Sequence, residues 1–262
     1  MMKRRKLIRY ASAGLLAALG TGVTARLHPS PAQSSNVLSI KWLGHTCFLF
    51  TGGGRRILVN PFRRIGCTAK YRDPNVVSDV VMISSQLLDE GVVEGLPGSP
   101  KLLYQPGVYE FDNFQVQGIG IPHDREGGRR FGTNVAWLWT QAGVKILHLG
   151  GAASPITFEQ KILMGRPDVM LLPVGGGPKA YTPSDAVEAV RTLNPRMVIP
   201  THYRTAAADA ETCDIVPVDA FLDLVKLVDG VQVGRPGSDG IALRRTDLPD
   251  EGPLVRVLSY KF

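Results

Sequence analysis

The chain has 262 residues, enough for one large domain or two small ones, and 44% of them are hydrophobic. Its formal net charge of +7 would suit a protein that binds nucleic acid. Five of the positive charges, however, lie together near the N-terminus, on Lys3, Arg4, Arg5, Lys6 and Arg9. Without them, 25 basic residues face 23 acidic ones. The rest of the chain is therefore close to neutral, and we expect no nucleic-acid partner.

Residues 1–35 have the composition of a targeting segment followed by a linker. The pair Arg4-Arg5, followed after one residue by Leu7-Ile8-Arg9, resembles a twin-arginine export motif. The apolar run 11–25 is shorter than the roughly 20 residues that a spanning helix needs, which favours a cleaved signal over an anchor. We expect an exported protein, in a periplasm or a thylakoid-type lumen. Membrane contact is expected only through this segment, if it is not cleaved.

From residue 37 onward, short apolar runs alternate with turns, a pattern that predicts strands. The predicted strands are 38–42, 47–51, 56–59, 80–84, 102–104, 114–119, 135–140, 145–148, 169–173 and 197–200. Gly52-Gly53-Gly54 and Ala142-Gly143 are predicted hairpin turns.

Helices are predicted only in the second half of the chain, at 158–164, after Thr182, and at 218–228. Thr182 is a capping residue that precedes a proline at the first helical position and an acid three residues later. Strands followed by strand–helix alternation predict an α/β fold with sheets covered by helices. We assign residues 36–262 to one such domain.

Three cysteines are too few for a disulfide framework, and no pair has the spacing of a zinc knuckle. Cys47 lies in an apolar run and is predicted to be buried in the core. Cys67 and Cys213 either remain free or form one bridge in an oxidising compartment.

Several short segments, read in order, resemble the metallo-β-lactamase superfamily, in its lactonase-like and phospholipase-D-like branch. They are Trp42-Leu43-Gly44-His45-Thr46 with Ile57-Leu58-Val59-Asn60-Pro61, Ile121-Pro122-His123-Asp124, Ile146-Leu147-His148-Leu149-Gly150, Leu171-Leu172-Pro173-Val174-Gly175-Gly176 and Val198-Ile199-Pro200-Thr201-His202-Tyr203. The resemblance implies a four-layer αββα sandwich with a site at one edge of two sheets. In intact relatives, histidines and carboxylates hold two metal ions, usually zinc, that activate water for hydrolysis.

The signature of that superfamily, His-x-His-x-Asp-His after a strand, is largely missing. Ser85-Gln86-Leu87-Leu88-Asp89-Glu90 occupies its place, so that only the aspartate survives. Gly151 stands where the resemblance implies a bridging aspartate, and Asn60 replaces an aspartate before Pro61. By position, the remaining ligands are Asp89, His123 and His202.

This loss limits the metals that the site can hold. The first metal position keeps only His123, and a single imidazole cannot hold zinc against water. The second keeps Asp89 and His202, with Glu90 as a substitute, and could weakly hold one harder ion such as Mn²⁺ or Fe²⁺. We expect no cofactor, or at most one divalent metal ion. As an alternative, Asp89 caps a helix expected after residue 88.

Four more residues are expected to line the cleft: His45, Ser85, His148 and Gly151. For His45 and His148, structural hydrogen bonds are favoured over ligand roles. Ser85 has no base beside it in the sequence and is not expected to be a nucleophile.

Two functions remain open. The sequence favours a non-hydrolytic descendant that binds a small molecule or a protein partner, because the lost ligands cluster at the metals while the scaffold motifs persist. The alternative is a metal-dependent hydrolase of ester, lactone or phosphodiester substrates with a rebuilt site for one ion.

Overall fold

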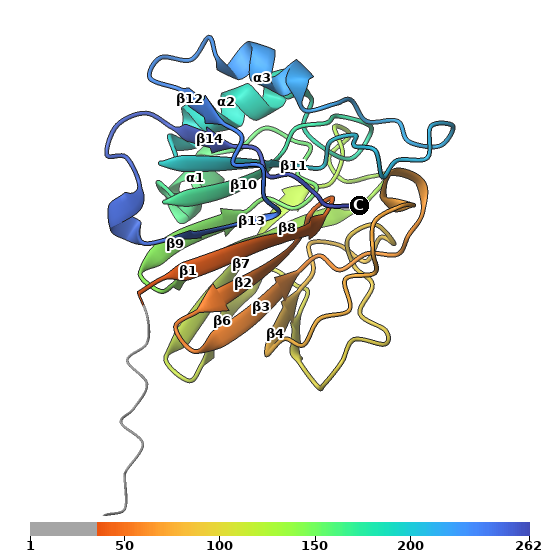
Figure 1. Ribbon diagram of the computed structural model, residues 1–262, viewed down its shortest axis with the longest axis vertical. Coiled ribbons are helices and arrows are strands. Elements are labelled where there is room, and N and C mark those ends of the chain that lie inside the picture. Colours follow the sequence, from red (N-terminus) through yellow and green to blue (C-terminus); the bar gives the residue numbers. More distant parts are fainter. Residues whose placement is uncertain (1–35) are drawn as a thin grey trace, which may run out of the picture. The chain divides into compact units, whose positions relative to one another are not determined.

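The computed structural model describes residues 36–262, so the predicted export signal lies outside the described residues. Within this range the chain forms two β-sheets, three α-helices and two short 3₁₀ turns (Figure 1). None of the described helices combines the length and the apolar character needed to cross a bilayer.

The first sheet contains mostly N-terminal strands and has the order β13-β1-β2-β3-β4-β5. Its strands are β1 (Leu38–Gly44), β2 (Cys47–Gly52), β3 (Arg55–Val59), β4 (Val80–Met82), β5 (Lys101–Leu103) and β13 (Gly240–Leu243). In β1, buried and exposed residues alternate, as expected for a strand with one face on the core. The turn at Gly53 and Gly54 has positive φ at both positions and joins β2 to β3, as predicted.

The second sheet has the order β12-β14-β11-β10-β9-β8-β7-β6. Its strands are β6 (Gly107–Phe111), β7 (Phe114–Pro122), β8 (Thr133–Gln141), β9 (Val144–His148), β10 (Val169–Pro173), β11 (Met197–Thr201), β12 (Gln232–Gly234) and β14 (Leu254–Arg256). Strands β9, β10 and β11 pair in parallel and are almost fully buried. Continuous burial is typical of parallel strands covered on both faces.

Helices α1 (Phe158–Met164), α2 (Pro183–Leu193) and α3 (Asp219–Val225) follow β9, β10 and β11 in turn and lie beside the second sheet (Figure 1). The α2 helix begins as predicted, because the hydroxyl of Thr182 accepts the backbone N–H of Asp185 and the Asp185 carboxylate accepts the backbone N–H of Thr182. The predicted α/β sandwich is confirmed. Its helical cover is uneven, because the described residues before 158 contribute only the 3₁₀ turn η1 (Gly66–Thr68).

The helix expected after residue 88 is not present. Residues 86–90 form a turn in which the N–H of Glu90 donates to the carbonyl of Leu87 (3.1 Å). The chain then folds back so closely that a Cβ on Gly91 would lie 2.0 Å from the carbonyl oxygen of Ser85. Asp89 is therefore not a helix cap. The glycine allows a tight turn that brings Asp89 and Glu90 towards the site.

The core fills the space between the two sheets with large apolar side chains, among them Phe48, Phe50 and Trp137. Each such buried side chain contributes about 1.5–3 kcal/mol. Cys47 belongs to this core and is a free thiol, as predicted.

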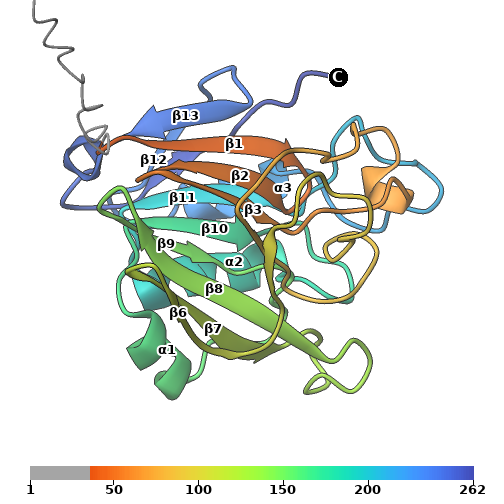
Figure 2. The ribbon, with the colours of Figure 1, turned by 90° about the horizontal axis from the view of Figure 1, so that it is seen from below.

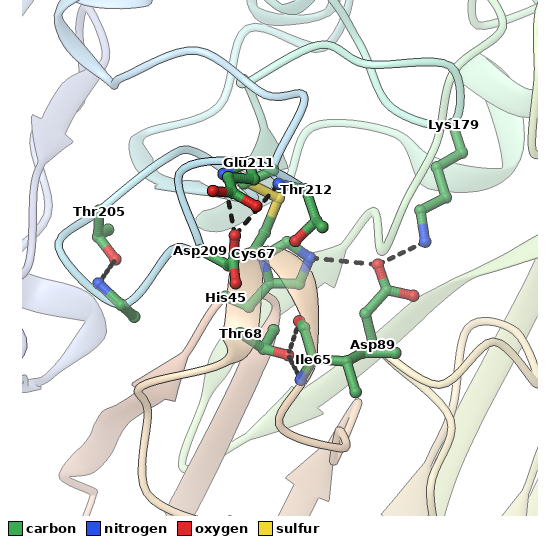
Figure 3. The surroundings of a disulfide bond; sticks show 12 residues. His45, Ile65, Cys67, Thr68, Asp89, Lys179, Thr205, Asp209, Glu211 and Thr212 are labelled. Carbon is green, nitrogen blue, oxygen red and sulfur yellow. Dashed lines mark hydrogen bonds and ion pairs between the residues drawn. A yellow bond between two sulfur atoms is a disulfide. The ribbon is translucent and has the colours of Figure 1, made fainter.

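Cys67 and Cys213 form a disulfide with a Cα–Cα distance of 4.7 Å. The bridge joins η1, which follows β3, to the loop that follows β11. The long loops gather at one end of the strands (Figure 2), and His45, Asp89 and Lys179 lie in the surroundings of the bridge (Figure 3). The bridge therefore fixes two of the loops that surround the site.

Candidate functional site

Three potential metal ligands from distant parts of the chain converge at this end of the sheets. His45 lies in the turn between β1 and β2, Asp89 in the loop after β4, and His202 directly after β11. One ligand atom from each lies within 4.8 Å of the others. The two imidazole rings have centroids 4.2 Å apart. We call these three residues the His45 cluster.

Both histidines have a left-handed backbone, with φ of 53° for His45 and 50° for His202. A non-glycine residue in this region carries strain of about 1–3 kcal/mol, and such strain concentrates at functional sites. Hydrogen bonds from residues outside the His45 cluster hold this backbone in place. Trp42 Nε1 donates to the carbonyl of His45 (3.1 Å), and the Gly175 N–H donates to the carbonyl of His202 (2.9 Å).

The imidazoles of the His45 cluster are buried, and three of their four ring nitrogens lack a hydrogen-bond partner among the described residues. His45 is 1% exposed and His202 is 2% exposed. Among the described residues, neither ring nitrogen of His45 has a hydrogen-bond partner, and Nδ1 of His202 has none. Burial, together with the nearby His45, lowers the pKa of His202 to about 3, so its ring is neutral near pH 7. The neutral form is the one that binds metals. The structural hydrogen bonds that the sequence favoured for His45 are absent.

Lys179 reaches the same carboxylate from the loop between β10 and α2. Its Nζ contacts Oδ2 of Asp89, and His45 Nε2 lies 3.6 Å from that oxygen (Figure 3). Burial opposes ionisation of Asp89, but the imidazole of His45 and the charge of Lys179 outweigh it and hold the pKa of this carboxyl well below its usual range. The sequence did not single out Lys179, because a lysine in a polar loop carries no recognisable signal.

Glu90 lies away from the His45 cluster and contacts His123. Glu90 Oε1 lies 3.0 Å from Nε2 of His123 and accepts the hydroxyl of Ser85 (2.7 Å). Burial disfavours the charged form of Glu90, but the charge of His123 and its contact with the carboxylate outweigh this effect and lower the pKa of Glu90. The hydroxyl of Ser85 also accepts the N–H of Leu87 (3.2 Å). Ser85 thus fixes the turn, and its nearest acid is already paired.

Gly151 faces His123 and leaves no room for a side chain. A Cβ at this position would lie 2.3 Å from Nε2 of His123. The Gly151 N–H donates to Oδ1 of Asn134 (2.8 Å), whose amide donates to the carbonyl of Leu149 (2.9 Å). The space of the implied bridging aspartate is therefore taken by the imidazole of His123.

His148 has a structural role, as predicted. Its Nε2 donates to the carbonyl of Thr46 (3.0 Å), and its Nδ1 accepts the N–H of Gly150 (3.1 Å). Acceptance at Nδ1 requires the neutral ring, and burial lowers the pKa of His148 to about 4. Asn60 is also structural, since its Oδ1 accepts the N–H of Ser84 (2.8 Å).

The donor set fits one metal ion and does not fit two. In the His45 cluster, unpartnered imidazole nitrogens face a carboxylate, which is the chemistry of a divalent-ion site. At the other position, both ring nitrogens of His123 also lack a hydrogen-bond partner among the described residues, but the acid beside it is Glu90, at 3.0 Å, and Gly151 supplies no ligand atom. Asp89 and His202 lie together as the sequence predicted, but the third member is His45 and not Glu90.

Comparisons with known proteins agree with this architecture. Residues 39–202 match the family described as the β-lactamase superfamily domain. A metal-dependent hydrolase of Thermoplasma acidophilum is 27% identical over 197 residues, which cover 64% of this chain and 84% of that protein. One of Methanoculleus marisnigri is 28% identical over 194 residues, with 65% and 83% covered.

A solved structure from Thermotoga maritima is also similar, with a TM-score of 0.64 and 28% identity. The similarity covers 85% of this chain and 100% of that protein, which is assigned to the Zn-dependent hydrolases of the metallo-β-lactamase superfamily. The matched family region, residues 39–202, contains all three members of the His45 cluster.

Proposed function

The chain belongs to the β-lactamase superfamily, and on that premise we propose that it is a hydrolase whose site holds one divalent metal ion on His45, Asp89 and His202. This is the alternative to the non-hydrolytic function that the sequence favoured. The names of the relatives, which are metal-dependent hydrolases, support it better.

The observation that carries the proposal is the set of unpartnered nitrogens on His45 and His202 beside an ionised carboxylate. Buried polar atoms in folded proteins normally have partners, and leaving one without a partner costs about 1–3 kcal/mol. An ion that accepts one lone pair from each ring would give one nitrogen of His45 and one of His202 a partner.

Two imidazoles and one carboxylate are the ligand set of several mononuclear catalytic sites, including those of zinc hydrolases and of Fe²⁺ enzymes. Three protein ligands leave coordination positions open for water and substrate. When bound, a divalent ion supplies the Lewis acidity on which hydrolysis by this superfamily depends. The substrate class that we propose is esters, lactones or phosphodiesters.

The other residues of the site lie around the proposed ion and contact its ligands or one another. The His123 ring lies 3.0 Å from the carboxylate of buried Glu90, the residue next to Asp89. The Asn134 amide fixes the backbone at Gly151 and so leaves space for the His123 ring. Lys179 neutralises Asp89 and is partly exposed, with 21% of its side chain accessible.

A second candidate function is a metal-free site that binds a ligand or a partner. The specific observation in its favour is that both acids already contact a nitrogen of the protein, the Lys179 ammonium for Asp89 and the His123 imidazole for Glu90.

The two functions are separated by assaying hydrolysis of ester, lactone and phosphodiester substrates after chelation and after addition of Zn²⁺, Mn²⁺ or Fe²⁺. The hydrolase proposal expects activity that one of these ions restores and that Asp89→Asn or His202→Gln abolishes. Asp239→Asn, a change at an exposed acid, is the matched control and should leave activity unchanged. Lack of turnover with every ion would favour the metal-free function. Robust activity that survives chelation would contradict the claim that hydrolysis depends on a metal ion.

We also propose that the protein is exported. The Cys67–Cys213 bridge supports this, since disulfides persist mainly in oxidising compartments. Changing Arg4 and Arg5 to lysine should retain the precursor in the cytoplasm. Unchanged export in cells that lack the twin-arginine translocase would refute this route.

A further inference from the structure

The cation nearest to the His45 cluster belongs to the protein itself. Nζ of Lys179 contacts Oδ2 of Asp89, the same carboxylate oxygen that faces His45 Nε2 at 3.6 Å. The ammonium group therefore stands beside the carboxylate that would hold a metal ion at this cluster (Figure 3).

The backbone around Lys179 is fixed by hydrogen bonds, while its side chain is partly exposed. The guanidinium of Arg125 donates to the carbonyls of Gly177 (3.1 Å) and Ala180 (2.8 Å), on either side of Lys179. The Gly176 N–H donates to the carbonyl of Tyr181 (2.8 Å) and closes the loop. The Lys179 side chain is 21% exposed, so part of it already faces water.

We propose that Lys179 is a tethered cation that competes with a divalent metal ion for the carboxylate of Asp89. The inference rests on the proposed metal site. Asp89 carries a single negative charge, which the ammonium neutralises. A divalent ion on His45, Asp89 and His202 would lie next to a charge of the same sign, in a region where little water screens the repulsion. The ion binds when Lys179 leaves Asp89, and Lys179 thereby lowers the metal affinity of the site.

The same contact explains how the metal-free protein tolerates an ionised Asp89 in a poorly solvated place. A buried charge without a partner is strongly unfavourable, and Lys179 supplies that partner. Metal and lysine are then alternative occupants of one position. Removing the lysine should weaken the metal-free protein and strengthen metal binding.

The test measures the dissociation constants of Zn²⁺ and Mn²⁺ by calorimetric titration of chelator-treated protein. Lys179→Met keeps the length of the side chain without its charge, and we expect metal binding at least about tenfold tighter than in the wild type, a difference of about 1.4 kcal/mol. Lys179→Arg keeps the charge and should bind as weakly as the wild type. Lys41→Met is the matched control, because Lys41 pairs with Asp239 at 3.9 Å on the exposed surface.

The melting temperature supplies a second readout besides the dissociation constant. Metal-free Lys179→Met should melt below the wild type, and added metal should restore its melting temperature, whereas Lys41→Met should show neither effect. Equal, measurable affinities of wild type and Lys179→Met would overturn the competition while the metal site stands. Absence of binding to either protein would overturn both.

Discussion

Two of the strand ends that contribute to the His45 cluster, those of β11 and β4, are held in different ways. After β11, His202 is placed by the backbone, because β10 and β11 pair in parallel up to Thr201 and the Gly175 N–H donates to the His202 carbonyl (2.9 Å). After β4, the turn that carries Asp89 and Glu90 is held mainly by side chains. Ser85 and His123 contact Glu90, and Lys179 contacts Asp89.

The difference shows which part of a site can change without loss of the fold. A residue placed by a parallel ladder keeps its position when its neighbours change. A turn held by side chains can exchange ligands for ion pairs, provided that each buried acid keeps a cationic partner. Residues 85–90 of the turn after β4 include no histidine, whereas His202 lies directly after β11.

The largest expected effect comes from breaking the buried pair in the turn. His123→Leu leaves Glu90 without the charge that lowers its pKa, and we expect a loss of about 3–5 kcal/mol in the free energy of unfolding. Denaturant unfolding measures it. As a comparison, Arg235→Leu breaks an exposed pair with Asp219 and should cost less than about 1 kcal/mol. Similar losses in the two variants would show that side-chain pairing does not hold the turn.

The second-largest loss of stability is expected from removing the disulfide between Cys67 and Cys213. It joins residues separated by 146 positions, so Cys67→Ser with Cys213→Ser should cost about 2–4 kcal/mol, towards the upper end because the loop is long. The melting temperature should fall on reduction in the wild type and be insensitive to reductant in the double variant. A wild type unaffected by full reduction would argue against this contribution.

His148, at the end of a strand in the second sheet, should make the stability of the fold depend on pH. Its pKa is lowered from 6.5 to about 4, so between these values the unfolded chain binds more protons than the folded one. Stability should therefore fall as pH falls from about 6.5 to about 4, by about 3 kcal/mol. His148→Gln should reduce this slope of unfolding free energy against pH. The same slope in wild type and variant would assign the acid sensitivity to other groups.

The smallest loss of stability in this series is expected from a substitution at Gly91. An added Cβ would meet the carbonyl of Ser85 at 2.0 Å, and this backbone contact must shift, so Gly91→Ala should cost about 1–3 kcal/mol. Gly120→Ala, where the nearest atoms lie at an ordinary 3.4 Å, is the control and should cost less. If Gly120→Ala were the more harmful change, the tight turn would not be the constraint that we describe.

Much of the fold could be predicted from the sequence, because most strands are apolar runs and because the cap of the α2 helix is formed by residues that are close in the sequence. The four strands that were missed are β6, β12, β13 and β14. Strand β6 is an edge strand that is mostly exposed, and its hairpin signal was the Asp112-Asn113 turn, with φ of 48° and 59°. The other three contain only three or four residues each, and β13 and β14 pair with strands far away in the sequence.

The site was predictable only where a residue stands at a motif position. Asp89 and His202 were found in this way. His45 was placed in the cleft, but its unpartnered nitrogens depend on the close approach of β1 and β11, which no local pattern reports. Lys179 is brought to Asp89 by a loop that is fixed through Arg125, a contact between residues more than fifty positions apart.

The central claim is that one divalent ion binds at the His45 cluster, and the stoichiometry of metal binding tests it most directly. The purified protein is stripped with chelator and titrated with Zn²⁺ and Mn²⁺, beside Asp89→Asn and His45→Gln. We predict one ion per chain in the wild type and none in either variant, while His123→Gln keeps the ion. Two tightly bound ions, or one ion that remains in Asp89→Asn and is lost in His123→Gln, would contradict the account.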